Sequence, residues 1–74
     1  MTRTKAILKV LQRERYAEAR ARVLRIFGVE TIEECDRVYD SLGNAERASL
    51  DAALANMIAS MGAAFELSVD NEMR

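Results

Sequence analysis

The apolar residues of this 74-residue chain recur every three or four positions, the spacing that places side chains on one face of a helix. Residues that interrupt helices are scarce, because the chain has no proline and only three glycines. The pattern predicts an all-α fold with helices at about residues 3–27, 31–42 and 44–67. Gly28 and Gly43 suit the ends of the first two helices, and the polar tail 68–74 is expected to fray.

The second and third helices each carry one apolar stripe. In the second helix, Thr31 and Glu34 form a capping box, in which each side chain accepts from the other residue's backbone N–H. Its stripe consists of Ile32, Cys35, Val38, Tyr39 and Leu42. The third helix has a stripe of Leu50, Leu54, Met57, Ile58, Met61 and Phe65. Its opposite face is small: Ala48, Ala52, Ala55, Ala59 and Ala63. This face either admits another helix at close range or reflects only the helix propensity of alanine.

The apolar stripe of the first helix changes face by about half a turn along its length. Its N-terminal part has one stripe (Ile7, Leu8, Val10, Leu11), and its C-terminal part has another on the opposite side (Tyr16, Ala17, Val23, Leu24, Phe27). Either the helix breaks near residues 12–15, or different bodies bury its two ends. Because no glycine or proline supports a break, we favour burial of the N-terminal stripe by a second copy of the chain.

The expected architecture is therefore an antiparallel hairpin of two long helices with a short connecting helix, assembled as a homodimeric helical bundle. The predicted dimer interface consists of Ile7, Leu8, Val10 and Leu11. Chain size favours the same interpretation, since a single domain this short buries a small core and gains from oligomerisation. Cys35 is the sole cysteine and histidine is absent, so neither an internal disulfide nor a structural zinc site can supply that stability.

No motif for catalysis, phosphate binding or metal binding is visible in the sequence. Cys35 lies on an apolar stripe and lacks a histidine to act as its base, so it is expected to be a core residue. Glu33, Asp36 and Asp40 line one side of the second helix, where a solvated acidic face is more plausible than a cation site. We predict a protein that is not an enzyme, with no cofactor and no small-molecule substrate. The longest uncharged run, 52–65, is shorter than the roughly 20 apolar residues of a membrane span, and a cytoplasmic location is expected.

Charge is distributed unevenly. Residues 1–27 carry eight basic and two acidic side chains, whereas residues 28–74 carry three basic and ten acidic ones, for a total of −1. This asymmetry indicates either a charged partner or two halves that face each other. Arg13, Arg15 and Arg22 support an alternative function as a nucleic-acid-binding or nucleoid-associated module. The low pI of about 5.4 counts against it, because DNA affinity rests on phosphate neutralisation.

The function favoured by the sequence is that of a small accessory protein that binds another protein. A phage- or plasmid-type inhibitor of a host regulatory protein, which covers a basic surface such as a DNA-binding face, fits the size and composition. The expected partner-binding residues are Glu33, Asp36, Tyr39 and Asp40. Tyrosine is enriched at interface hot spots, and the surrounding acids would attract a basic partner.

Overall fold

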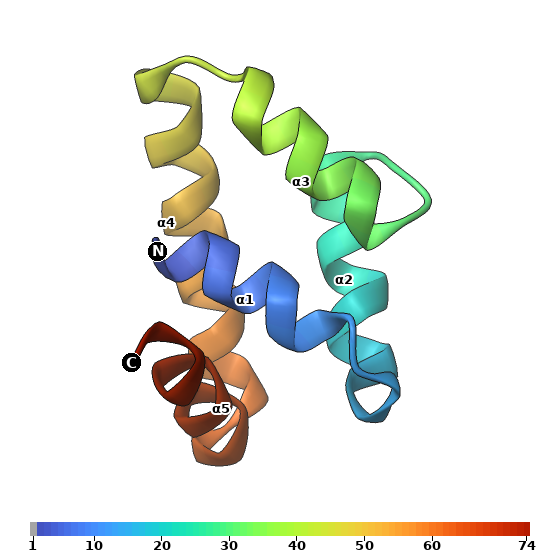
Figure 1. The fold of residues 1–74 in the computed structure, drawn as a ribbon, viewed down its shortest axis with the longest axis vertical. Helices are drawn as coiled ribbons and strands as arrows, with labels where there is room; N and C mark the ends of the chain where they lie inside the picture. The colour runs from blue at the N-terminus through green and yellow to red at the C-terminus, as the bar shows by residue number, and fades with distance from the viewer. Residues whose placement is uncertain (1) are drawn as a thin grey trace.

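The chain is all-helical, as predicted. The computed structural model describes residues 2–74 except for the side chain of Glu14, and this part of the chain contains helices and turns without any strand (Figure 1). The elements are α1 (Arg3–Leu11), the short 3₁₀ helix η1 (Glu14–Tyr16), α2 (Ala17–Phe27), α3 (Ile32–Ser41), α4 (Asn44–Met61) and α5 (Ala63–Met73). Each of the two long helices expected from the sequence is thus divided in two. None of the helices in the described part is long and apolar enough to cross a membrane.

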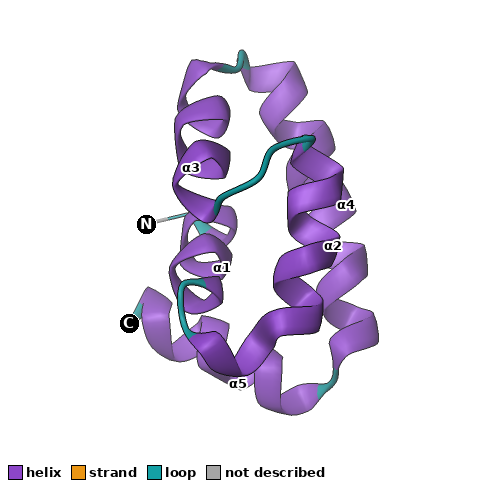
Figure 2. Ribbon diagram, turned by 90° about the vertical axis from the view of Figure 1, so that its right-hand side faces the viewer, coloured by secondary structure: helices purple, strands orange, loops and turns teal. Residues whose placement is uncertain are grey.

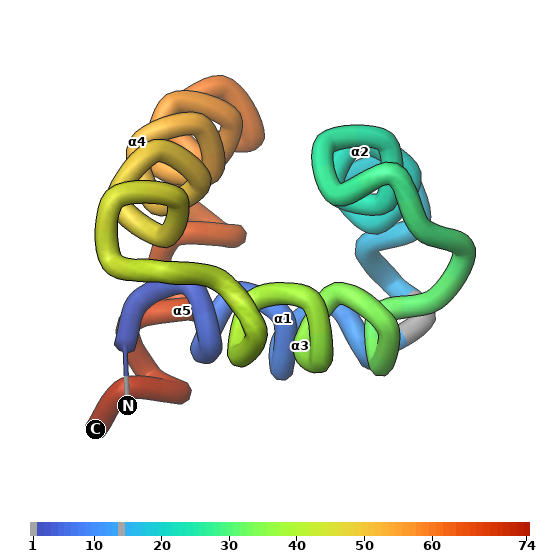
Figure 3. The backbone as a smooth tube through the Cα atoms, turned by 90° about the horizontal axis from the view of Figure 1, so that it is seen from above, coloured from blue at the N-terminus to red at the C-terminus, as the bar shows by residue number. Residues whose placement is uncertain are grey.

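The helices form two layers. Viewed from above, α1 and α3 lie on one side of the molecule, while α2 and α4 stand on the other side, separated from each other (Figure 3). The perpendicular view shows the same division, with α1 and α3 in one column and α2 and α4 in the other (Figure 2). The C-terminal helix, α5, turns away from the end of α4 and packs mainly against α1. The predicted hairpin is therefore not the arrangement that the chain adopts.

The prediction of an unbroken helix over 3–27 is wrong. Helical backbone ends at Leu11, and Arg13 is extended with ψ of 142° before the chain re-enters helix through η1. The break falls between the two inverted apolar stripes, so both stripes reach the same core. Ile7, Leu8, Val10 and Leu11 are at most 2% exposed, and Val23 of α2 is fully buried. Burial of such side chains contributes about 1.5–3 kcal/mol each, more than the few helical hydrogen bonds that the break forfeits.

Arg20 stabilises the C-terminal end of α1, where the sequence has neither glycine nor proline. Its Nε donates to the Leu11 carbonyl oxygen at 2.7 Å, and its second guanidinium nitrogen donates to the carbonyl oxygen of Arg13. The last carbonyls of a helix otherwise lack partners, and a cation is favourable at this negative end. A side chain from the following helix therefore terminates α1 without glycine or proline.

The second break lies at Gly62, between α4 and α5. Its φ of 100° is in the region that side chains other than glycine rarely adopt. The predicted fraying of residues 68–74 is also wrong, because α5 continues to Met73 and Val69 is fully buried. Two ion pairs attach this helix to the N-terminal segment, from Arg3 to Asp70 at 3.3 Å and from Arg13 to Glu72 at 3.0 Å.

The core combines the stripes predicted for all parts of the chain. Leu54, Met57, Ile58 and Phe65 are buried together with the α1 stripe, and Ile32 and Cys35 join them from α3. The Thr31 hydroxyl accepts from the Glu34 N–H at 3.2 Å, which confirms half of the predicted capping box. The other half differs, since the Glu34 carboxylate accepts from the backbone N–H of Glu30 at 3.4 Å.

Candidate protein-binding surface

The acidic side of α3 faces α1. Asp36 and Asp40 both contact the Lys5 ammonium group, with a distance of 2.6 Å in each pair. Burial lowers the pKa of Lys5, but the hydrogen bonds and charges of the two carboxylates outweigh it, so that the pKa of Lys5 is raised overall. Glu33 is exposed and makes no ion pair with the described residues. Two of the three acids expected to steer a partner thus already hold a cation of their own chain.

Tyr39 is a core residue and not an exposed hot spot, contrary to its predicted role. Its side chain is 4% exposed, and its hydroxyl donates to Asp51 Oδ1 at 2.8 Å. The same carboxylate oxygen accepts from the Thr4 hydroxyl. Lys5 and Arg47 contact the ring as cation–π partners, at 5.6 and 5.4 Å from its centroid. Burial, together with the hydrogen bond to Asp51, raises the pKa of Tyr39.

The residues predicted to form a dimer interface are buried inside the single chain. Ile7, Leu8, Val10 and Leu11 lie between 0% and 2% exposed in the common core. In this conformation they cannot contact a second copy. The inverted stripe correctly identified residues that are buried. Because the first helix ends at Leu11, the core of the same chain buries them, and not a second copy.

The arginines considered for nucleic-acid binding have different environments. Arg13 pairs with Glu72 at 3.0 Å, whereas Arg22 pairs with Glu18 at 3.1 Å and approaches the Met61 sulfur at 3.7 Å. Arg15 is exposed and lies over the ring of Tyr16 at 5.5 Å from its centroid. The chain therefore does not bring the three arginines into one free basic patch.

The charge asymmetry is partly balanced by ion pairs within the molecule. Of the five ion pairs among the described residues, four join residues 1–27 to residues 28–74. The fifth is the local pair between Arg22 and Glu18. The two halves of opposite charge face each other, so the asymmetry by itself does not call for an external partner.

An apolar groove lies between α2, α3 and α4, and the sequence did not predict it. Its volume is about 300 Å³, and its lining consists of Ile26, Phe27, Val38, Leu42, Glu46, Ser49 and Leu50. Ile26 is 39% exposed, and the other four apolar residues are half-buried. Val38, Leu42 and Leu50 belong to the apolar stripes predicted for the second and third helices. The available signal was Ile26, a large apolar residue outside the stripe assigned to its helix.

The remaining features are a buried thiol, a row of exposed alanines and a second concavity. Burial raises the pKa of the Cys35 thiol to about 11, so its thiolate is a minor species near neutral pH. The described residues hold no group of three or more side chains suited to a metal ion. The alanines at 48, 52, 55, 59 and 63 are all exposed on the outer side of α4 and α5. A second concavity of about 370 Å³ is lined by Lys5, Leu8, Lys9, Gln12, Ile32 and Asp36.

No protein-family model, curated protein or solved structure matches this chain.

Proposed function

We propose that this protein is a small non-enzymatic accessory protein that binds another protein in the cytoplasm. The observation that carries the proposal is the apolar groove of Ile26, Phe27, Val38, Leu42 and Leu50, which no described segment of the chain covers. Concave apolar surface at the junction of several helices is typical of sites that receive a partner. The wider role as a phage- or plasmid-type modulator of a regulatory protein, expected from the sequence, is retained within this proposal.

The binding surface that we propose differs from the acidic face expected from the sequence. Covering a basic surface of a regulator would require Asp36 and Asp40, whose carboxylates are shared with Lys5. It would also require Tyr39, which the core already uses. The groove demands no such rearrangement, because its side chains are partly exposed as they stand.

Affinity capture from a lysate of the source organism tests the function, with three forms of the tagged protein compared side by side. These are the wild type, the groove variant Ile26→Asp and the control variant Ala52→Asp. Ala52 is exposed on the side of α4 away from the core, so the control adds the same charge at a neutral site. We expect one partner to be captured by the wild type and the control and lost with the groove variant. Capture that is the same for all three forms, or absent with the wild type, contradicts the proposal.

Nucleic-acid binding is the second candidate, favoured by one observation. Arg15 and Arg25 are exposed and form no ion pair with any described residue. A DNA-binding role predicts affinity that falls steeply as salt rises, and alanine at both positions would flatten that dependence. We expect no duplex binding tighter than about 10⁻⁵ M at physiological salt, near the range of non-specific contacts. Sub-micromolar, salt-sensitive binding would reverse the ranking of the two candidates.

A further inference from the structure

A single residue, Gly62, separates α4 from α5, and the helical pattern of the sequence continues across it. Helix α4 ends at Met61, and α5 begins at Ala63. On an uninterrupted helix, the buried side chains on both sides of Gly62 would fall within an arc of about 120°. These side chains are Leu54, Met57, Ile58, Phe65 and Val69. One straight helix over residues 44–73 would therefore keep the same side chains on one apolar face.

The backbone of Gly62 makes the bend between the two helices. Its φ of 100° and ψ of 167° lie in a region that is open essentially to glycine alone. Its neighbours Met61 and Ala63 are strong helix formers, so nothing else at this junction opposes a straight helix. Because a short hinge favours the exchange of an element between two copies of a chain, this bend is a candidate point of exchange.

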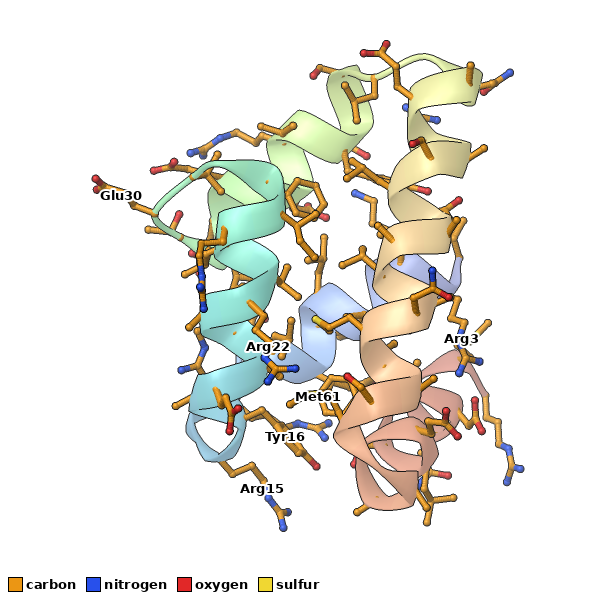
Figure 4. All side chains as sticks on the ribbon, turned by 180° about the vertical axis from the view of Figure 1, so that it is seen from behind. Arg3, Arg15, Tyr16, Arg22, Glu30 and Met61 are labelled. Carbon is orange, nitrogen blue, oxygen red and sulfur yellow. The ribbon has the colours of Figure 1, made fainter. Side chains whose placement is uncertain are left out.

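Helix α5 is held mainly by α1 and η1, which belong to the other end of the chain. Phe65 and Val69 of α5 are buried, at 2% and 0% exposed. Tyr16 of η1 points toward α5, and its ring meets that of Phe65 edge-on, with 4.9 Å between the centroids (Figure 4). The hydroxyls of Tyr16 and Ser68 are hydrogen-bonded at 2.8 Å. A straight helix in an isolated copy would lose these contacts and expose both apolar side chains.

Charge also specifies the position of α5. Arg3 pairs with Asp70 at 3.3 Å, and Arg13 pairs with Glu72 at 3.0 Å. In both pairs, α5 supplies the acid and the N-terminal segment supplies the base. A second copy of the chain carries the same apolar surface and the same two arginines, so it offers α5 an identical binding surface.

We propose that two copies of this chain exchange α5. In the exchanged dimer, α4 and α5 form one straight helix, and the α5 of each copy docks on the α1 and η1 of the other. The contacts of α5 with these two elements are kept, now between chains, and the backbone change is confined to the hinge at Gly62. Since association costs translational and rotational freedom, the closed monomer dominates at low concentration and the dimer forms at high concentration. This inference is independent of the proposed function, because α2, α3 and α4 stay together in each unit.

Replacement of Gly62 by alanine tests the hinge. No atom lies within 4 Å of a Cβ added at this position, so the substitution acts through the backbone. Alanine is strained at the φ of the bend and is the better helix former in the straight helix. Because a dimer contains two hinges, its association constant should exceed that of the wild type by a factor of at least about a thousand. At micromolar concentration, the variant should sediment as a dimer and the wild type as a monomer.

Gly28→Ala is the matched control. Gly28 also has a positive φ, of 72°, and an added Cβ there likewise meets no atom within 4 Å. The variant therefore introduces the same kind of strain at the end of α2. Helical pattern does not continue past this glycine, since Thr31 begins a new cap three residues later. We expect Gly28→Ala to lose stability and to remain a monomer.

Exchange itself is measured by NMR on a mixture of two chains. One is ¹⁵N-labelled, and the other is unlabelled and carries a nitroxide attached through Asp70→Cys. The two are unfolded in urea and refolded together. Since Asp70 contacts Arg3 in the closed form, exchange should broaden the α1 amides of the ¹⁵N-labelled chain. A nitroxide attached through Ala45→Cys, about 25 Å along α4 from Gly62, should leave those amides sharp.

The outcomes are distinct. Broadening between chains in Gly62→Ala at micromolar concentration, and in the wild type refolded at millimolar concentration, supports the exchange. A Gly62→Ala chain that folds as a monomer overturns the inference. A dimer without broadening of α1 assigns the association to another surface and overturns it as well. If Gly62→Ala does not fold, the wild type at millimolar concentration decides, and sharp α1 amides there refute the exchange.

Discussion

Replacement of Arg20 by alanine tests the physical reason for the break between α1 and α2. The side chain is half-buried and donates to the carbonyl oxygens of Leu11 and Arg13, the first at 2.7 Å. A hydrogen bond from a charged donor contributes about 1.5–3 kcal/mol. Because the guanidinium is partly exposed and water can replace it, the two bonds together should stabilise the folded state by about 2–3 kcal/mol.

The free energy of unfolding of Arg20→Ala should therefore fall by about 2–3 kcal/mol relative to the wild type. In a domain of this size, that loss lowers the melting temperature by about 8–24 °C. Urea denaturation followed by circular dichroism at 222 nm measures the free energy, and a thermal scan measures the shift. The matched control is Arg25→Ala, which removes an exposed arginine of the same helix and should remain within about 0.5 kcal/mol of the wild type.

Two outcomes would refute this reasoning. If Arg20→Ala is as stable as its control, the carbonyls of α1 are satisfied adequately by solvent and the arginine does not maintain the break. If the variant gains helical signal and sediments as a dimer, residues 12–16 have become helical and the inverted stripes are buried by separate bodies. That second outcome would restore the architecture expected from the sequence.

Three further predictions concern the core. Leu54→Ala should lower the free energy of unfolding by about 2–5 kcal/mol because Leu54 is fully buried, whereas Leu67→Ala, at a residue 59% exposed, should change it by less than about 0.5 kcal/mol; equal effects would contradict the described core. Tyr39→Phe should lower the free energy of unfolding by about 1 kcal/mol, because the hydrogen bond to Asp51 is lost, and Tyr39→Ala should lower it by about 3–5 kcal/mol. An alanine variant as stable as the wild type would show that Tyr39 is not a core residue. Burial raises the pKa of Cys35 from 9.0 to about 11, so the folded state holds the thiol proton more tightly than the unfolded state does. The resulting contribution to the free energy of unfolding is complete below pH 9 and is lost as the pH rises toward 11. The stability difference between wild type and Cys35→Ala should shrink by about 2–3 kcal/mol over that range, and parallel pH profiles would contradict the cause.

The sequence by itself determined the helical class and most of the residues that are buried. The periodic stripes of the third predicted helix became the buried faces of α4 and α5, and those of the second became the inner face of α3. Helical periodicity is a local property, because it follows from 3.6 residues per turn, and it can be read without knowledge of the fold. The inverted stripes of the first helix also showed correctly that one straight helix could not serve one core.

Only the tertiary structure decided between a broken first helix and burial of its two stripes by separate bodies. It also decided where the candidate site lies. The break at residues 12–16 depends on Arg20, whose guanidinium reaches the carbonyls of the preceding helix, a contact that no local residue preference announces. Tyr39 became a core residue because Asp51 of α4 accepts from its hydroxyl, and the Thr4 hydroxyl of α1 donates to the same carboxylate oxygen. Ile26 borders a groove because α2, α3 and α4 surround it without covering it. These outcomes depend on how helices are placed relative to one another, and the periodicity within each helix carries no information about that placement.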